Sequence, residues 1–96
     1  MLVSTKAEVN RVIDYYSKVI ALNDQYNAAY FNRGNCYGEI EEYDKAISDF
    51  TSAIAIAPTS FAEYYSWRAY AFECRGRPGD AVLAAADREK SKSLKG

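Results

Sequence analysis

The side chains that most often do chemistry are sparse in this sequence, and their spacing does not assemble a reaction centre. The chain has no histidine, which removes the commonest general base and the commonest metal ligand. Three carboxylates, Glu41, Glu42 and Asp44, fall together in a polar stretch, where we expect a solvated turn rather than a carboxylate site. No glycine-rich phosphate loop, nucleophile motif or metal-ligand spacing is present. The sequence therefore predicts a protein that is not an enzyme and that needs no metal or other cofactor.

Two cysteines and two arginines are the remaining candidates for reactivity or for binding through charge. Cys36 and Cys74 lie in segments with helical patterning and form no CxxC pair, so we expect free thiols in a cytoplasmic protein, where thiols stay reduced. Arg75 and Arg77 form a basic spot that lacks aromatic residues arranged for base stacking, and the formal net charge of the chain is −1. No apolar run approaches the ~20 residues that span a bilayer. These features favour neither nucleic acid nor a membrane as the partner.

Two amphipathic patterns stand back to back in the middle of the chain and would position any surface site. In each, apolar or small residues recur every three or four positions, which places them on one face of a helix. A glycine inside a helix costs roughly 1 kcal/mol relative to alanine. Gly34 therefore predicts a close crossing of two helices, with Ala46 as the residue expected opposite it. The two rows are Tyr30, Gly34, Tyr37 and Ile40, followed by Ala46, Phe50, Ala53 and Ala57.

This spacing resembles the tetratricopeptide repeat, a helical hairpin of 34 residues. The family has an aromatic residue, a glycine and a tyrosine on its first helix, with alanine, phenylalanine, alanine and proline on and after its second. Arg33 stands where the family often has leucine, and Glu41 where the turn often has glycine. The positions that match in register are Tyr30, Gly34, Tyr37, Ala46, Phe50, Ala53 and Pro58.

The segment before this repeat resembles a second helix whose own first helix is missing. Residues 7–24 match the second helix of the central repeat after a shift of 34 positions, so they are expected to form a half repeat. A capping box of Thr5 and Glu8 is expected to open the helix. One apolar stripe of this helix would lack a partner, and we expect it to join two copies into a homodimer. That self-association edge consists of Val12, Tyr16 and Val19.

The central repeat spans residues 27–60. The segment that follows it matches this repeat at an offset of 35 positions. Residues 61–94 are therefore expected to form a full repeat with a degenerate terminal helix, after one extra residue in the connecting loop. A second capping box is expected at Ser60. The polar end of the chain suits a terminal helix whose outer face meets water, and a truncated longer array is the alternative. In the last helix Ala81 aligns with Ala46, Ala85 with Phe50, and Arg88 with Ala53.

These patterns predict an all-α fold, a short right-handed α-solenoid of antiparallel helix pairs, with five helices in a single domain over residues 1–96. The resemblance implies a non-catalytic protein–protein interaction module, with a scaffold or adaptor role, that binds a peptide or a partner helix in a concave groove. The alternative is a structural self-assembly module that uses its end faces, or a fragment of a larger protein of the same family. The partner is expected to be a protein or peptide.

In this family the first helices line the groove, and the matching positions here carry aromatic, amide and acidic side chains. Trp67 has an alternative place in the core, since tryptophan is highly buried on average. One subfamily binds chaperone carboxylates through Lys, Asn and Arg. Here Asn32 matches, but Glu63 and Trp67 replace the cations, so we expect a different kind of groove. The expected groove residues are Phe31, Asn32, Asn35, Glu63, Ser66, Trp67 and Tyr70, with Ala28, Glu39 and Cys74 continuing the same rows.

Overall fold

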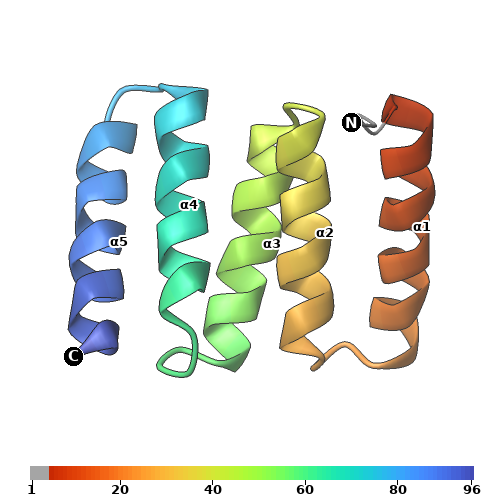
Figure 1. The fold of residues 1–96 in the computed structure, drawn as a ribbon, viewed down its shortest axis with the longest axis horizontal. Coiled ribbons are helices and arrows are strands. Elements are labelled where there is room, and N and C mark those ends of the chain that lie inside the picture. The colour runs from red at the N-terminus through yellow and green to blue at the C-terminus, as the bar shows by residue number, and fades with distance from the viewer. Residues whose placement is uncertain (1–4) are drawn as a thin grey trace.

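Five α-helices make up the part of the chain that the computed structural model describes, residues 5–96, and this part contains no strand. Each helix packs against the next one in the sequence, and α2 also contacts α4. Figure 1 shows the helices in chain order, from α1 at one end of the row to α5 at the other. The predicted all-α architecture of five helices is confirmed. The helices are α1 (Lys6–Leu22), α2 (Asn27–Glu39), α3 (Tyr43–Ile56), α4 (Ala62–Arg75) and α5 (Asp80–Lys95).

Only one of the two predicted capping boxes caps a helix. At the start of α1, the Oγ1 atom of Thr5 accepts a hydrogen bond from the backbone N–H of Glu8 at 3.1 Å, as expected. The box predicted at Ser60 is wrong, because the residue at the N-cap of α4 is Phe61 and no side chain caps the helix. The ring of Phe61 stacks instead on Tyr64, with 4.8 Å between the ring centroids. Aromatic packing therefore decides where α4 begins.

The apolar core consists of two clusters that α3 connects. Ala46 and Phe50 on α3 pack with Ala71 on α4 in the first cluster. In the second, residues of α4 and α5 pack together, and Ile47 on α3 contacts both clusters. Small side chains at the helix crossings allow the backbones to approach, and the larger rings fill the space beside them. The second cluster contains Ala69, Phe72 and Ala84.

Gly34 makes room for a ring rather than for the backbone of α3. A Cβ atom at this position would lie 2.8 Å from Cε1 of Phe50 and 3.2 Å from Cβ of Asp49. The close approach that we predicted is present, but its expected partner, Ala46, is not the residue nearest to the missing side chain. Phe50 is 2 % exposed, and its ring is the group that an added side chain at Gly34 would meet first. The glycine is therefore required by the size of Phe50.

Two arginines tie the first helix of each repeat to the second. Arg33 donates from Nε and Nη2 to the two carboxylate oxygens of Asp49, both at 2.8 Å. Arg68 does the same to Asp87, at 2.8 and 2.7 Å. In each case Nη1 donates to a hydroxyl on the second helix of the preceding repeat, at 3.1 and 3.2 Å. These hydroxyls belong to Ser17 and Thr51.

The register that we predicted for the last helix is wrong by three residues. Arg33 and Asp49 are 16 positions apart, whereas Arg68 and Asp87 are 19 apart. Ala81 is accordingly exposed, and Ala84 is the small residue buried at 1 % against α4. The three extra residues lie in the turn after Gly76, where a Pro-Gly pair lengthens the connection. Arg88 therefore takes the place of Phe50, and Ser91 the place of Ala53.

The turns inside the two repeats share one left-handed residue. Gly76 ends α4 with a φ of 65°, and Glu41 has a φ of 63° at the matching position after α2. Glycine adopts this region freely, but a side chain there costs energy because Cβ approaches the backbone. The family's preference for glycine at this turn position has this physical cause, and Glu41 adopts the same conformation at a cost.

The packing at Gly34 predicts opposite effects for two matched substitutions in α2. Gly34→Ala should lower the free energy of unfolding by about 1–3 kcal/mol, because the new Cβ would collide with the ring of Phe50. Gly38→Ala should raise it by up to about 1 kcal/mol, because no atom lies within 4 Å of a Cβ there and alanine favours the helix. Chemical denaturation of both variants would measure the difference. Equal effects of the same sign would contradict this packing.

The left-handed turn predicts a stabilising substitution. Glu41→Gly should raise the free energy of unfolding by about 1 kcal/mol, because it relieves the strained backbone conformation. Gly76→Ala should lower it by a similar amount, because it introduces the same strain. Thermal melts of the two variants would check both signs, and a lower midpoint for Glu41→Gly would refute the assignment of strain.

Candidate functional site

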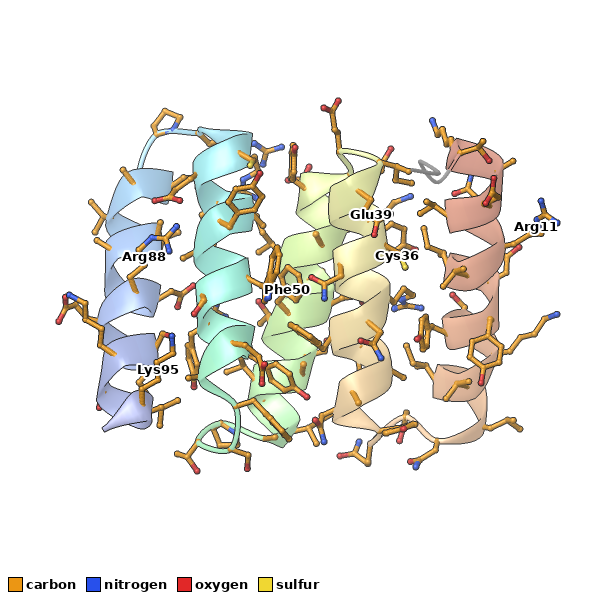
Figure 2. The ribbon with its side chains drawn as sticks, in the orientation of Figure 1. Arg11, Cys36, Glu39, Phe50, Arg88 and Lys95 are labelled. Atoms are coloured by element: carbon orange, nitrogen blue, oxygen red, sulfur yellow. The ribbon has the colours of Figure 1, made fainter. Side chains whose placement is uncertain are left out.

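A cleft of about 390 Å³ opens between α2, α3 and α4. Phe50 lies at its base, and in Figure 2 this ring is seen between α2 and α4, with Glu39 at the end of α2. The ring also belongs to the core, so the base of the cleft is held by the packing of three helices. The cleft is bordered by Asn35, Gly38, Glu39, Tyr43, Phe50, Trp67, Tyr70 and Ala71.

Four residues of the predicted groove rows border this cleft: Asn35, Glu39, Trp67 and Tyr70. Trp67 is 46 % exposed and Tyr70 is 53 % exposed, so the alternative placement of Trp67 in the core is wrong. Asn32 is half-buried and Glu63 is exposed, and neither borders the cleft. Only part of each predicted row therefore borders the cleft.

Two predicted groove residues pack between helices instead. Phe31 stacks on Tyr64 with 4.6 Å between ring centroids, and it lies 5.7 Å from the ring of Phe50. The Oγ atom of Ser66 is 2.6 Å from the Oγ atom of Ser91 on α5, so this hydroxyl faces the terminal helix. Both side chains hold neighbouring helices together, which leaves them unavailable to line a groove.

Sequence reasoning missed the contribution of α3 to the cleft. Tyr43 begins α3 and borders the opening, although it lies within the stretch of Glu41, Glu42 and Asp44 where we expected a solvated turn. Gly38 and Ala71 widen the cleft because they carry little or no side chain. The available signal was the spacing of Tyr43 and Phe50, which are seven residues apart and therefore share a face of the helix.

The cleft is aromatic and carries one formal charge. The rings of Trp67 and Tyr70 lie 6.1 Å apart and are inclined at 84° to each other. Burial is the larger cause that raises the pKa of Tyr43, whereas the pKa of Tyr70 is raised mainly by its interaction with the Cys74 side chain. Both phenols therefore remain neutral at physiological pH. Glu39 is the only formally charged side chain among the described residues that border the cleft.

The two arginines of the basic spot singled out in the sequence both pair with one carboxylate of the acidic stretch, Asp44. Asp44 accepts hydrogen bonds from Arg75 at 3.0 Å and from Arg77 at 2.9 Å. Arg75 also donates to both carboxylate oxygens of Asp80, at 2.9 and 2.8 Å, and this pairing lowers the pKa of Asp80 to about 2. These contacts connect the start of α3 to the end of α4 and to the turn that follows it, which is a structural role.

The described residues form neither a metal site nor a membrane-spanning helix. Within residues 5–96, no group of three or more metal-ligating side chains is placed to hold an ion. In that same part of the chain, no helix is both long enough and apolar enough to cross a membrane. Cys36 and Cys74 are free thiols, and burial raises the pKa of Cys36, which keeps its thiol protonated.

The first helix exposes one apolar stripe at the end of the molecule. Val12 is 42 % exposed, Tyr15 62 % and Leu22 90 %, while Tyr16 and Val19 are half-buried. Of the three residues in the predicted stripe, Val12 is therefore exposed, whereas Tyr16 and Val19 are only partly exposed. Its most exposed aromatic residue is Tyr15, whose ring meets that of Tyr16 edge-on, with centroids 5.3 Å apart.

A comparison with known families identifies the hairpin of α2 and α3. Residues 28–60 match the family model described as the tetratricopeptide repeat. This part of the chain is a tetratricopeptide repeat. The resemblance noted in the sequence is confirmed, and with it the fold class, an all-α helical repeat. The family indicates a protein–protein interaction module.

Proteins similar to this tetratricopeptide-repeat chain are about a third identical to it over the aligned residues. The small glutamine-rich tetratricopeptide repeat-containing protein 2 of Saccharomyces cerevisiae is 33 % identical over 72 residues, which are 75 % of this chain and 20 % of that protein. Two crystal structures of MamA are each 31 % identical and cover 92 % of this chain, with TM-scores of 0.82 and 0.84. The chain spans about a fifth of the yeast protein, and 46 % and 49 % of the two MamA chains.

Proposed function

We propose that this chain is a non-catalytic scaffold or adaptor module, which binds a segment of a partner protein in the cleft between α2 and α4. The observation that carries the proposal is the pair of exposed aromatic side chains, Trp67 and Tyr70, beside a hollow of about 390 Å³. Aromatic residues at the centre of an interface contribute most to binding, because they bury a large area with few rotatable bonds. The repeats divide as 7–24, 27–60 and 61–94 in this proposal.

The shape and the polar groups of the cleft favour an extended peptide or one face of a helix. Asn35 borders the cleft with an amide that can both donate to and accept from a backbone. The base at Phe50 is held rigidly by the core, so little conformational entropy is lost when a ligand binds. A protein partner is also favoured over nucleic acid, because Arg33, Arg68 and Arg75 are each paired with an aspartate. We place the module in the cytoplasm, where its thiols stay reduced.

Removing the aromatic wall and the amide should abolish capture of the partner. We expect the double variant Trp67→Ala with Asn35→Ala to lose at least tenfold in partner recovery, because a buried aromatic anchor contributes 2 kcal/mol or more to binding. Quantitative affinity purification with mass spectrometry would measure the loss, and circular dichroism would check that helicity is unchanged. Val82→Ala, which changes an exposed side chain on α5, is the matched control. A partner that the double variant retains in full would exclude the cleft as its binding site.

The second candidate function is self-association through the edge of α1. Ser17 and Thr51 accept equivalent hydrogen bonds and are 34 positions apart, so α1 aligns with α3 at that offset. The residues that face α2 on α3 are Ala46, Asp49, Phe50 and Ala53, and their equivalents on α1 are Val12, Tyr15, Tyr16 and Val19. No helix among the described residues covers this face of α1, and Tyr15 replaces the aspartate of the arginine pair. A second copy of the chain would bury the stripe around a two-fold axis.

A charge in the stripe should prevent this dimer. We expect the chain to be dimeric at tens of micromolar, and Tyr15→Glu to be monomeric, because the introduced carboxylate would be desolvated at the contact. Size exclusion with light scattering would measure the mass. Tyr70→Glu in the cleft is the matched control and should remain dimeric. A monomeric wild type at high micromolar concentration would exclude the edge as a dimer contact.

A further inference from the structure

Aromatic rings from two helices enclose the opening of the cleft. Trp67 and Tyr70 come from consecutive turns of α4, and Tyr43 comes from the start of α3. The planes of Trp67 and Tyr70 are inclined at 84°, so the two rings form walls that are nearly at right angles. The face of an aromatic ring is the negative part of its quadrupole and attracts a cation within about 6 Å of the centroid. Three aromatic residues therefore border one hollow, and a cation bound there would lie beside aromatic rings.

Glu39 borders the same cleft, and its carboxylate has no ion-pair partner among the described residues. Among residues 5–96, no lysine or arginine nitrogen forms an ion pair with Glu39. Lys6 borders a separate, smaller cleft that shares Glu39, yet it lies beyond ion-pair distance of the carboxylate. A ligand cation would therefore find an accessible opposite charge beside the rings.

The arginines of α4, α5 and the turn between them do not offset this charge, because each is already paired. Arg75 and Arg77 bind Asp44, and Arg75 also binds Asp80. Arg88 on α5 forms an ion pair with Glu73 on α4, and Figure 2 shows its side chain directed from α5 toward α4. An anionic ligand would meet Glu39 with no cation to balance it, whereas a cationic ligand would meet both the carboxylate and the ring faces.

From this arrangement we infer that the cleft binds a basic peptide by enclosing one lysine or arginine side chain between Tyr43, Trp67 and Tyr70, with Glu39 as its counter-charge. This inference rests on the proposed peptide-binding function and names the ligand class for the same site. The aliphatic stem of the side chain would pack on Phe50 and the ammonium or guanidinium group would face the rings, since long cationic side chains bury their stems and keep the charge near polar groups. Asn35 would hydrogen-bond the peptide backbone beside it.

The chain contains a single tryptophan, so the fluorescence of Trp67 reports directly on the cleft. The probes are four matched peptides, acetyl-Gly-Ser-X-Ser-Gly-amide, in which X is lysine, arginine, norleucine or glutamate. We expect the lysine and arginine peptides to bind about tenfold tighter than the norleucine peptide, because cation–π attraction and the counter-charge together supply this difference. Their affinity should also fall as salt is added.

A charge-neutralising variant isolates the role of Glu39. Glu39→Gln should weaken binding of the lysine peptide about fivefold and leave the norleucine peptide unchanged. Asp14→Asn, which removes one charge from an exposed position on α1, is the matched control and should change neither. Chemical shifts of the backbone amides around the cleft would confirm where each peptide binds.

The possible results separate the two proposals. If the norleucine or glutamate peptide binds as tightly as the lysine and arginine peptides, the inferred preference for a cation is overturned and the peptide-binding cleft stands. If Glu39→Gln leaves the affinity for the lysine peptide unchanged, the role of the counter-charge is overturned. If none of the four peptides at millimolar concentration changes the fluorescence of Trp67 or the amide shifts, the cleft itself is overturned as a peptide site.

Discussion

The bidentate pairing of an arginine with a buried aspartate is the interaction on which the arrangement of these helices depends. Asp49 and Asp87 are 4 % and 5 % exposed, and a carboxylate removed from water in this way is tolerated only when charged donors satisfy it. Arg33 and Arg68 meet this requirement with two parallel hydrogen bonds each, a geometry that fixes the rotation of one helix against the other. The third donor of each arginine reaches a hydroxyl of the preceding repeat. One side chain therefore sets both the packing within a repeat and the packing between repeats.

The same pairing explains why the two ends of the row differ. On α1 the position of the aspartate is occupied by Tyr15, so this end presents an apolar, aromatic surface in place of an acceptor for an arginine. On α5 the position of the accepting hydroxyl is occupied by Glu89, which is exposed and forms an ion pair with Lys92 at 3.6 Å. A charged side chain at this position meets water at little cost. The two ends thus differ at the positions of this pairing, with an aromatic residue on α1 and a charged residue on α5.

The cleft is a consequence of how these pairs hold α2, α3 and α4. Phe50 requires the space left by Gly34, and with this ring fixed in place the surface above it remains hollow. In the following repeat the equivalent positions are Ala69 and Arg88, and this more polar pair leaves no ring at the base. A rigid apolar base with exposed aromatic rings at its rim is the arrangement in which a bound side chain loses little entropy and gains a large contact area.

The sequence by itself determined the helices, the repeat and the family. Helical periodicity and the small residues Gly34 and Ala46 are local patterns, which do not depend on how the helices are arranged in space. The sequence also predicted that Asn35, Trp67 and Tyr70 lie on one exposed face, since spacing along a helix decides which residues share a side. Only the tertiary structure decided that Phe31 and Ser66 turn inward, that Tyr43 joins the cleft, and that α5 is shifted by three residues. These features depend on which side chain lies opposite across a helix contact. Periodicity within one helix carries no information about the rotation and the register of its neighbour, which are set by the arginine–aspartate pairs and by the length of the turn after Gly76.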